Sequence, residues 1–333
     1  MKIALIAPGI MPVPPPGWGA VEIIIWDYYN ELLAAGNEVI IINKLRREPN
    51  DQSHPKTAYC QALITEINNG TYDFVHIHYD VLFHIIPFIT TARVIGITSW
   101  YPYIDKPEQH NRDGFTVIFN AICKNDNHYI IASSKKDYDM FYKFCNDKSK
   151  IFITLNGANH KEIFPYPLDR EVINSEKSLY LAKIEERKKQ YVYCRIPNID
   201  FYGKCEDAGF ASLNCFKGEA QRCNLNDILN SYGNMVLLSS GENGTPLAIK
   251  EALMAGLPIV INNNSANDLD LTQPFIDIIP NDKLMDFDFI VDVIKQNLKK
   301  RHLCSQIREY AEINFSWKNI MKTYIDKINS IMQ

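Results

Sequence analysis

Short apolar runs rich in β-branched residues alternate along the chain with longer segments whose apolar positions recur at helical spacing. The runs of the first half are KIALIAP, NEVIIIN, YDFVHIH, ARVIGITS, NHYIIAS and SKIFITL. Those of the second half are KSLYLAK, NIDFYGK, GNMVLLSS and LPIVINN. Strands and helices in alternation indicate βαβ units, which form parallel sheets. The pattern therefore predicts an α/β protein with two doubly wound, Rossmann-like domains.

A stretch with turn residues and two prolines, Asn156–Glu176, joins the two halves. This composition suits a connection between domains. We place the boundary within it, so that residues 1–168 form the first domain and residues 169–315 the second. Residues 316–333 have apolar positions at helical spacing and predict a C-terminal amphipathic helix.

Composition and charge narrow the class of protein. The 333 residues are 46% apolar and 22% charged, which is typical of a soluble folded protein. A formal net charge of −4 gives no electrostatic case for a nucleic-acid partner, so we expect a small-molecule ligand. The eight cysteines include no CxxC pair, and we expect reduced thiols in a cytoplasmic protein, with a disulfide network as the alternative that the even count allows. No transmembrane run is predicted, and peripheral contact with a membrane stays open.

One segment of the second domain combines a glycine-containing turn with an almost wholly apolar helix. It reads SSGENGTPLAIKEALMAGLPIVINN and begins at Ser239. Thr245 and Pro246 are residue types preferred at the N-cap and at the first helical position, so we predict a helix that begins at Pro246. Its polar residues are Lys250 and Glu251, and we expect the Lys250 side chain to extend outward into solvent.

Glu251 lies on an apolar face of this helix, where a carboxylate costs free energy unless it is hydrogen-bonded or paired. The helix start offers the backbone N–H groups of Gly244, Thr245 and Leu247 together with the positive end of the helix dipole, a combination that binds anions. An anion at the helix start and hydroxyl groups one turn deeper describe a nucleoside diphosphate whose ribose donates to Glu251. The alternative is a structural glutamate that caps a neighbouring backbone.

The segment that begins at Ser239, together with four other stretches of the chain in their order, resembles the retaining nucleotide-sugar glycosyltransferases of the GT-B fold, in particular glycosyltransferase family 4. The segment NGTPLAIKEALMAGLPIV is similar to the family's EGxPLxxxEAMAxGxPVV signature. The other matching stretches are LAKIEERKKQ, ITLNGANHKEIFPY, PPPGWGAVE and the closing FSW with its helix. The resemblance covers nearly the whole chain. It implies two Rossmann-like domains that face each other across a cleft, with the last helix crossing back to the first domain.

The resemblance implies transfer of a sugar from a UDP or GDP sugar to a glycan or other hydroxyl acceptor, with retention and without a metal or any further cofactor. Lys183 and Lys188 would neutralise the leaving diphosphate. The implied donor-binding residues are Gly19, Gly244, Thr245, Pro246, Leu247 and Glu251. The implied acceptor-side residues are Trp18, Ser99 and Trp100. The Asp-x-Asp spacing at Asp268 and Asp270 lies in a loop and is a weak metal candidate.

The sequence departs from the family pattern at the first signature glutamate. That position aligns with Asn243, and Glu242 stands one residue earlier. Counting back from the helix start, we predict that Asn243 contacts the sugar and that Glu242 is a nearby helper. Retaining transfer is thought to use the departing phosphate to take the acceptor proton, so the loss of this carboxylate need not abolish turnover.

A second departure concerns a first-domain histidine that the family commonly has near the sugar. Thr98, Ser99 and Trp100 occupy that region here. His76 and His78 share one face of the preceding strand, and we interpret them as a strand end at the cleft, with buried core histidines as the alternative.

Three other functions are weighed against transfer. A nucleotide-sugar epimerase of the same architecture and a nucleotide-sugar-binding protein that has lost transfer both stay open. A dehydrogenase is disfavoured, because Gly17 and Gly19 lie in a proline-rich loop and Glu22 stands where the dinucleotide fingerprint has its third glycine.

Overall fold

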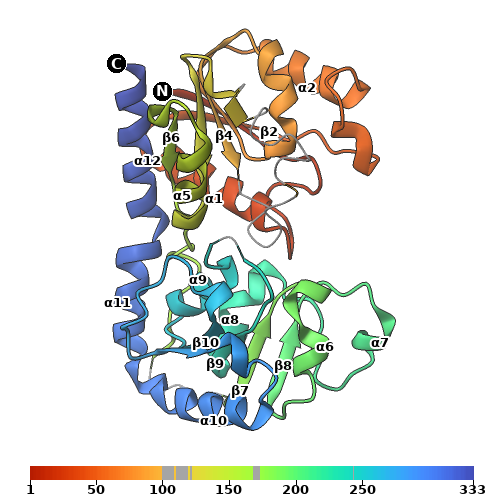
Figure 1. The fold of residues 1–333 in the computed structure, drawn as a ribbon, viewed down its shortest axis with the longest axis vertical. Helices are drawn as coiled ribbons and strands as arrows, with labels where there is room; N and C mark the ends of the chain where they lie inside the picture. Colours follow the sequence, from red (N-terminus) through yellow and green to blue (C-terminus); the bar gives the residue numbers. More distant parts are fainter. Residues whose placement is uncertain (100–108, 110–118, 121, 168–172, 243) are drawn as a thin grey trace. The chain divides into compact units, whose positions relative to one another are not determined.

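The structure is a computed structural model that describes residues 1–99, 109, 119–120, 122–167, 173–242 and 244–333. It divides into two compact units. The colours of Figure 1 follow the chain through both of them. The first unit comprises Met1–Pro15, Gly19–Asn156 and Ile320–Gln333, and the second comprises Pro16–Trp18 and Gly157–Asn319. Both are built on a parallel sheet with helical connections, so the predicted pair of Rossmann-like α/β units is confirmed.

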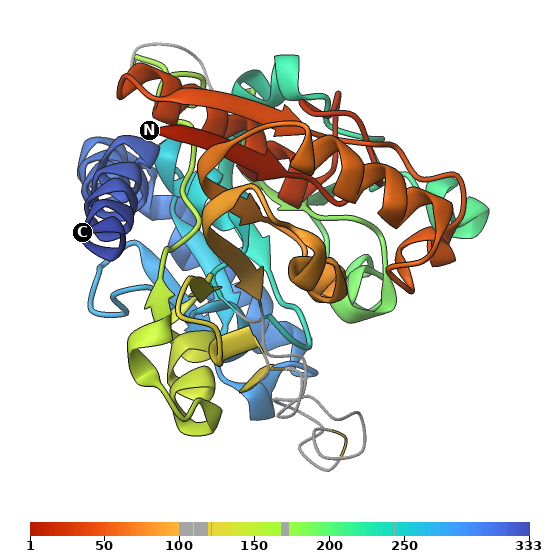
Figure 2. The same ribbon diagram turned by 90° about the horizontal axis from the view of Figure 1, so that it is seen from above.

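The first unit contains a six-stranded sheet in the order β2-β1-β3-β4-β5-β6, whose twist is visible in Figure 2. Its strands are β1 (Lys2–Ile6), β2 (Glu38–Ile42), β3 (Tyr72–Ile77), β4 (Ala92–Ser99), β5 (His128–Ala132) and β6 (Ile151–Ile153). Its helices include α1 (Ala20–Ala34), α2 (Ala58–Asn68), α5 (Lys135–Phe144) and the 3₁₀ segment η2 (Asp80–Phe88). The six predicted apolar runs form these six strands, and each strand contributes buried residues to the core of the unit.

The second unit contains a five-stranded sheet in the order β11-β10-β9-β7-β8. Its strands are β7 (Asn174–Leu181), β8 (Ile199–Tyr202), β9 (Tyr232–Leu237), β10 (Ile259–Asn262) and β11 (Ile276–Ile279). Its α-helices are α6 (Gln190–Tyr193), α7 (Ala208–Ala211), α8 (Leu225–Asn230), α9 (Leu247–Met254), α10 (Phe287–Leu298) and α11 (Cys304–Phe315). Two 3₁₀ segments matter for the site, η4 (Glu186–Lys188) and η5 (Arg222–Asn224).

The chain passes between the units at Asn156 and Gly157, earlier than the boundary expected after residue 168. Ala158 and Ile163 belong to the hydrophobic core of the second unit, which explains the earlier division.

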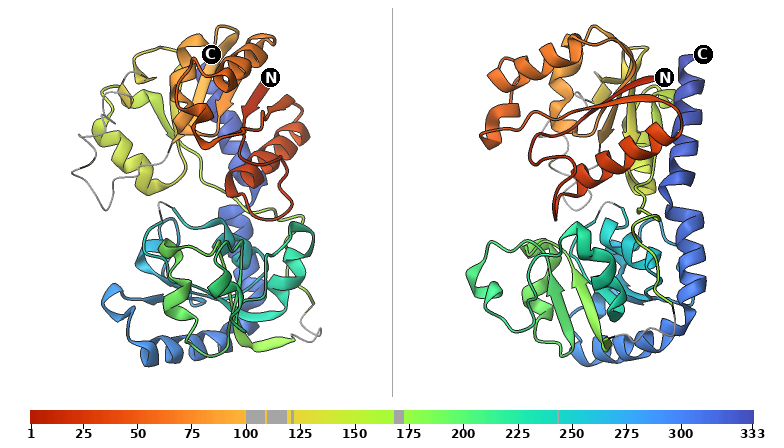
Figure 3. Two further views of the ribbon diagram at one scale, coloured as in Figure 1. Left: turned by 90° about the vertical axis from the view of Figure 1, so that its right-hand side faces the viewer. Right: turned by 180° about the vertical axis from the view of Figure 1, so that it is seen from behind.

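The last helix, α12 (Trp317–Met332), begins in the second unit and contributes Ile320–Gln333 to the first. It is the dark blue helix that ends at the C-terminus in Figure 3. Within the first unit its Tyr324 and Ile328 side chains are buried, and the Tyr324 ring lies 5.1 Å from that of Tyr28.

Two further expectations from the sequence concern the cysteines and membrane-spanning segments. The eight cysteines are free thiols. Among the described helices, none combines the length and apolar content needed to cross a bilayer.

Candidate functional site

The turn between β9 and α9 carries the clearest sequence signal, and its helix starts one residue later than predicted. Pro246 has an extended ψ of 142° and acts as the N-cap residue, so α9 begins at Leu247. The prediction that Thr245 caps the helix is wrong: its Oγ1 is buried and has no hydrogen-bond partner among the described atoms. The Pro246 carbonyl accepts the first helical hydrogen bond, from the Ile249 N–H at 3.0 Å.

Asp268 lies beside the start of α9. Its Oδ2 accepts a 3.3 Å hydrogen bond from the backbone N–H of Thr245, one of the donors expected to bind an anion. Asp270 instead accepts hydrogen bonds from Thr272 and Gln273 in its own loop. The described part of the chain holds no group of three or more His, Cys, Asp or Glu side chains arranged for a metal ion. Through its bond to the Thr245 N–H, the Asp268 carboxylate places a negative charge at the N-terminus of α9, where the helix dipole favours it.

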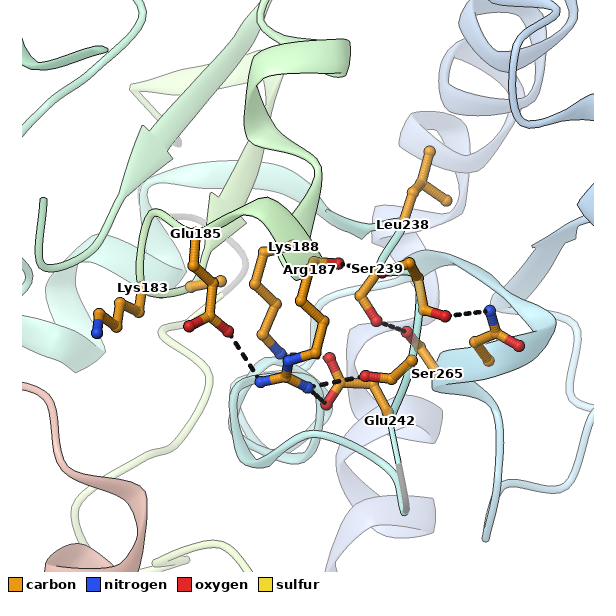
Figure 4. A network of polar contacts seen from close by, with 12 residues as sticks. Lys183, Glu185, Arg187, Lys188, Leu238, Ser239, Glu242 and Ser265 are labelled. Carbon is orange, nitrogen blue, oxygen red and sulfur yellow. Dashed lines mark hydrogen bonds and ion pairs between the residues drawn. The ribbon is translucent and has the colours of Figure 1, made fainter. Parts of the chain in front are cut away.

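Glu242 is the centre of an ion-pair network that joins the segment after β7 to the turn after β9 (Figure 4). Lys188 Nζ donates to Glu242 Oε1, and Arg187 Nη1 donates to Glu242 Oε2 at 3.0 Å. Arg187 Nη2 also donates to Glu185 Oε1 at 2.9 Å. Because β7 and β9 are neighbours in the sheet, their following segments meet at the same edge. The resulting cluster, Glu185, Arg187, Lys188 and Glu242, contains two cations and two carboxylates.

The Lys188–Glu242 pair is shielded from water and held in place by a buried tyrosine. Lys188 is 9% exposed, and burial lowers the pKa of its ammonium group while the Glu242 carboxylate acts in the opposite direction. The Tyr180 hydroxyl donates to the Lys188 carbonyl at 2.6 Å and accepts from the Leu238 N–H at 3.0 Å. Tyr180 thereby links the two segments that carry the pair.

Lys183 lies apart from this network, and in Figure 4 its side chain points away from Glu242. Its Nζ is 5.3 Å from the centroid of the Trp18 ring, and Lys204 Nζ is 4.4 Å from the same ring. Of the two predicted lysines, the structure brings only Lys188 to Glu242 within the described residues. Arg187 was not among the predicted site residues, although it stands in the same EERKK run.

Glu251 on α9 is buried and paired with an arginine from a distant segment. Its side chain is 5% exposed, and Arg222 Nη1 donates to its Oε1 at 2.5 Å. Arg222 begins η5, just before α8. The predicted need of this carboxylate for a donor is therefore met in the protein itself. Arg222 was not predicted, because a contact between segments 29 residues apart leaves no local signal.

The expectation that Lys250 extends into solvent is wrong. Its side chain is fully buried, with Nζ 5.2 Å from the centroid of the Phe315 ring. Burial lowers the pKa of Lys250 to about 8, and the Asp268 carboxylate partly opposes this effect. The α11 helix, which carries Phe315, packs over α9 and covers the face expected to be exposed.

Several predicted residues belong to the first unit or cannot be placed. Gly19 is the N-cap residue of α1 with φ 126°, and a Cβ there would lie 3.1 Å from Glu22 Oε2. Ser99 is buried, and its Oγ donates to Asp80 Oδ2 at 3.2 Å. Asn243 and Trp100 lie outside the described residues.

His76 and His78 are buried in the core of the first unit, which agrees with the core-histidine alternative. His76 pairs through both ring nitrogens, Nε2 with Thr98 Oγ1 at 2.7 Å and Nδ1 with the Tyr324 hydroxyl at 2.8 Å. The two imidazole rings stack with centroids 3.7 Å apart. Burial lowers the pKa of His78 to about 3, so both rings are held neutral.

Comparison with known proteins finds similar solved structures but no matching family model or curated sequence. Among solved structures, sucrose-phosphate synthase from Thermosynechococcus elongatus aligns with TM-score 0.74 and 15% identity over 99% of each chain. HepE from Anabaena, in complex with UDP-glucose, aligns with TM-score 0.72 and 12% identity over 99% of this chain and 100% of that one.

A third neighbour is AviGT4, a glycosyltransferase involved in avilamycin A biosynthesis. It aligns with TM-score 0.68 and 14% identity over 99% of this chain and 98% of that one. Alignment over nearly the full length of both chains covers both α/β units. The chain therefore has the GT-B fold, as predicted.

Proposed function

We propose that the protein is a retaining glycosyltransferase that transfers a sugar from a UDP or GDP sugar to a hydroxyl acceptor, without a metal, as in glycosyltransferase family 4. The observation that carries this proposal is the cluster of Arg187, Lys188 and Glu242 at the sheet edge from which α9 starts. Two cations at such an edge suit a diphosphate. The UDP-glucose bound by HepE, a protein of the same fold, supports the donor class.

In this proposal Lys188 and Arg187 grip the diphosphate and stabilise the charge that develops on it as the sugar leaves. Both cations are paired with Glu242 in the structure, so a diphosphate would replace that carboxylate as their partner. The backbone N–H groups of Gly244 and Leu247 at the start of α9 contribute further stabilisation, whereas that of Thr245 is bonded to Asp268.

The sugar end of the donor involves the turn before α9. We propose that Asn243 contacts the sugar and that Glu242 is a nearby helper. The bond between the sugar carbon and the diphosphate oxygen breaks, and the bond to the acceptor oxygen forms on the same face of the sugar. The acceptor proton passes to the departing diphosphate, so no side chain is required as a base.

The test is incubation of the purified protein with a panel of UDP, GDP and ADP sugars, with and without glycan and small hydroxyl acceptors. Release of nucleoside diphosphate together with a product of retained anomeric configuration, seen by NMR and unaffected by EDTA, is the expected result. An epimerised sugar would replace the proposal by an epimerase. Binding of a donor without turnover on any acceptor would replace it by a binding function.

A further inference from the structure

The pairing of Arg222 with Glu251 leads beyond the donor site as proposed so far. Glu251 lies on α9, the helix whose start is assigned to the donor, and its side chain is 5% exposed. Arg222 reaches it from η5, and the Arg222 side chain is itself 19% exposed. We propose that Arg222 is a positioning residue that fixes the Glu251 carboxylate for the ribose hydroxyls of the nucleotide. This inference rests on the proposed function.

The need for a cation follows from the charge of Glu251. A buried carboxylate is costly unless it is both hydrogen-bonded and paired with an opposite charge. Ribose hydroxyls are neutral, so they can donate hydrogen bonds to Glu251 but cannot balance its charge. Arg222 supplies that balance within the protein, through the contact of its Nη1 with Glu251 Oε1 at 2.5 Å.

One oxygen of the Glu251 carboxylate remains available to accept a hydrogen bond from a ligand. Arg222 Nη1 bonds to Oε1, and among the residues that the structure describes no second hydrogen bond reaches the Glu251 side chain. A carboxylate has two oxygens and about four acceptor positions. With Oε1 anchored, the side chain is held in one orientation and Oε2 remains an acceptor for a hydroxyl group.

The cations of the second unit therefore divide between two tasks. Arg187 and Lys188 are paired with Glu242 and would move to the diphosphate. Arg222 stays paired with Glu251 when the ribose binds, because the neutral ribose hydroxyls cannot replace the charge of either partner. An arginine suits this second task better than a lysine, because its guanidinium is planar, directional and always charged.

The experiment compares ribose with dideoxyribose in calorimetric binding of UDP, GDP and their 2′,3′-dideoxy counterparts. The proteins are the wild type, Arg222→Met, Glu251→Gln and the double variant, with Arg195→Met as a control that removes an exposed cation from the same unit. Arg222→Met is expected to weaken binding of the preferred ribonucleotide by about tenfold and to leave dideoxynucleotide binding unchanged. The double variant should be no weaker than Glu251→Gln alone, since Arg222 acts through Glu251.

Each other outcome has a definite meaning. Unchanged ribonucleotide binding by Arg222→Met would overturn the inference. Tighter binding would overturn it as well, because Arg222 would then obstruct the ribose. Equal losses for ribo- and dideoxynucleotides would also overturn it, in favour of a structural or phosphate-binding role. A wild type that binds no nucleotide would remove the proposed function as well. If Arg222→Met does not fold, Arg222→Lys keeps the charge, and a fall in its ribose preference is expected in support.

Discussion

The hydroxyl of Tyr324 on α12 lies 2.8 Å from Nδ1 of His76 on β3, a contact between residues 248 positions apart. Because His76 Nε2 is already paired with Thr98, the Tyr324→Phe variant leaves a buried ring nitrogen without a partner. We expect this variant to lose about 1–3 kcal/mol in the free energy of unfolding of the first unit, measured by urea denaturation. Tyr142→Phe, which removes the hydroxyl of a 40% exposed tyrosine on α5, is the matched control. Equal stability of the two variants would contradict a role for this contact.

The buried histidines also predict how stability depends on pH. Burial lowers the pKa of His78 from 6.5 to about 3, so the folded protein keeps it neutral while the unfolded chain binds a proton below pH 6.5. Its contribution to the free energy of unfolding is therefore complete above pH 6.5 and declines as the pH falls toward 3. His78→Phe should make the free energy of unfolding less steep in pH by about 1.4 kcal/mol per unit between pH 6 and 4.5.

The control for this prediction is His54→Gln, since His54 is exposed in the same unit. Urea unfolding at a series of pH values, followed for wild type and both variants, provides the slopes. A His78→Phe slope as steep as that of the wild type would mean that His78 is charged in the folded protein.

The sheets follow from sequence wherever burial is nearly complete. The predicted strands carry apolar residues that are buried in the two sheets, because parallel strands covered by helices need such residues. The four-residue edge strand β11 was not predicted. Asp277 pairs with Lys300, a contact that the local pattern does not reveal.

The candidate site was predicted only in part, because its side-chain contacts join segments that are distant in the sequence. The position of Glu251 on an apolar face indicates that a donor must exist, but not that Arg222 provides it. The charge run EERKK does not tell which cations turn toward Glu242. Lys250 was expected in solvent because its own helix gives no sign that α11 covers it. Such side-chain contacts depend on tertiary packing and not on periodicity.

The separation of the two predicted lysines leads to a prediction about turnover. Lys188 is paired with Glu242, whereas Lys183 lies against the Trp18 ring. We expect Lys188→Met to reduce kcat on the order of 100-fold, because it removes a charge that stabilises the leaving diphosphate. Lys183→Met should reduce kcat by less than about tenfold. Steady-state kinetics with the preferred nucleotide sugar provide the comparison, and the reverse ranking would assign the diphosphate to Lys183.

The exchange of Glu242 for a diphosphate can be tested by removing its charge. In the structure the cluster of Glu185, Arg187, Lys188 and Glu242 is neutral, since its two cations balance its two carboxylates. Glu242→Gln removes the carboxylate partner of Lys188 and one of the two carboxylate partners of Arg187, which stays paired with Glu185, and gives the cluster a net positive charge. We therefore expect the variant to bind free UDP or GDP about tenfold more tightly at low salt, measured by calorimetry.

This gain should shrink as salt is added, because screening weakens the attraction between the positively charged cluster and the diphosphate. Glu185→Gln is the matched control: it also removes one negative charge, but Glu185 is bonded only to the Nη2 of Arg187 in this cluster and leaves the Lys188 pair intact. Its effect on affinity should be smaller. If Glu242→Gln binds the nucleotide more weakly than the wild type, Glu242 instead orients Lys188 for the diphosphate, and the two do not compete.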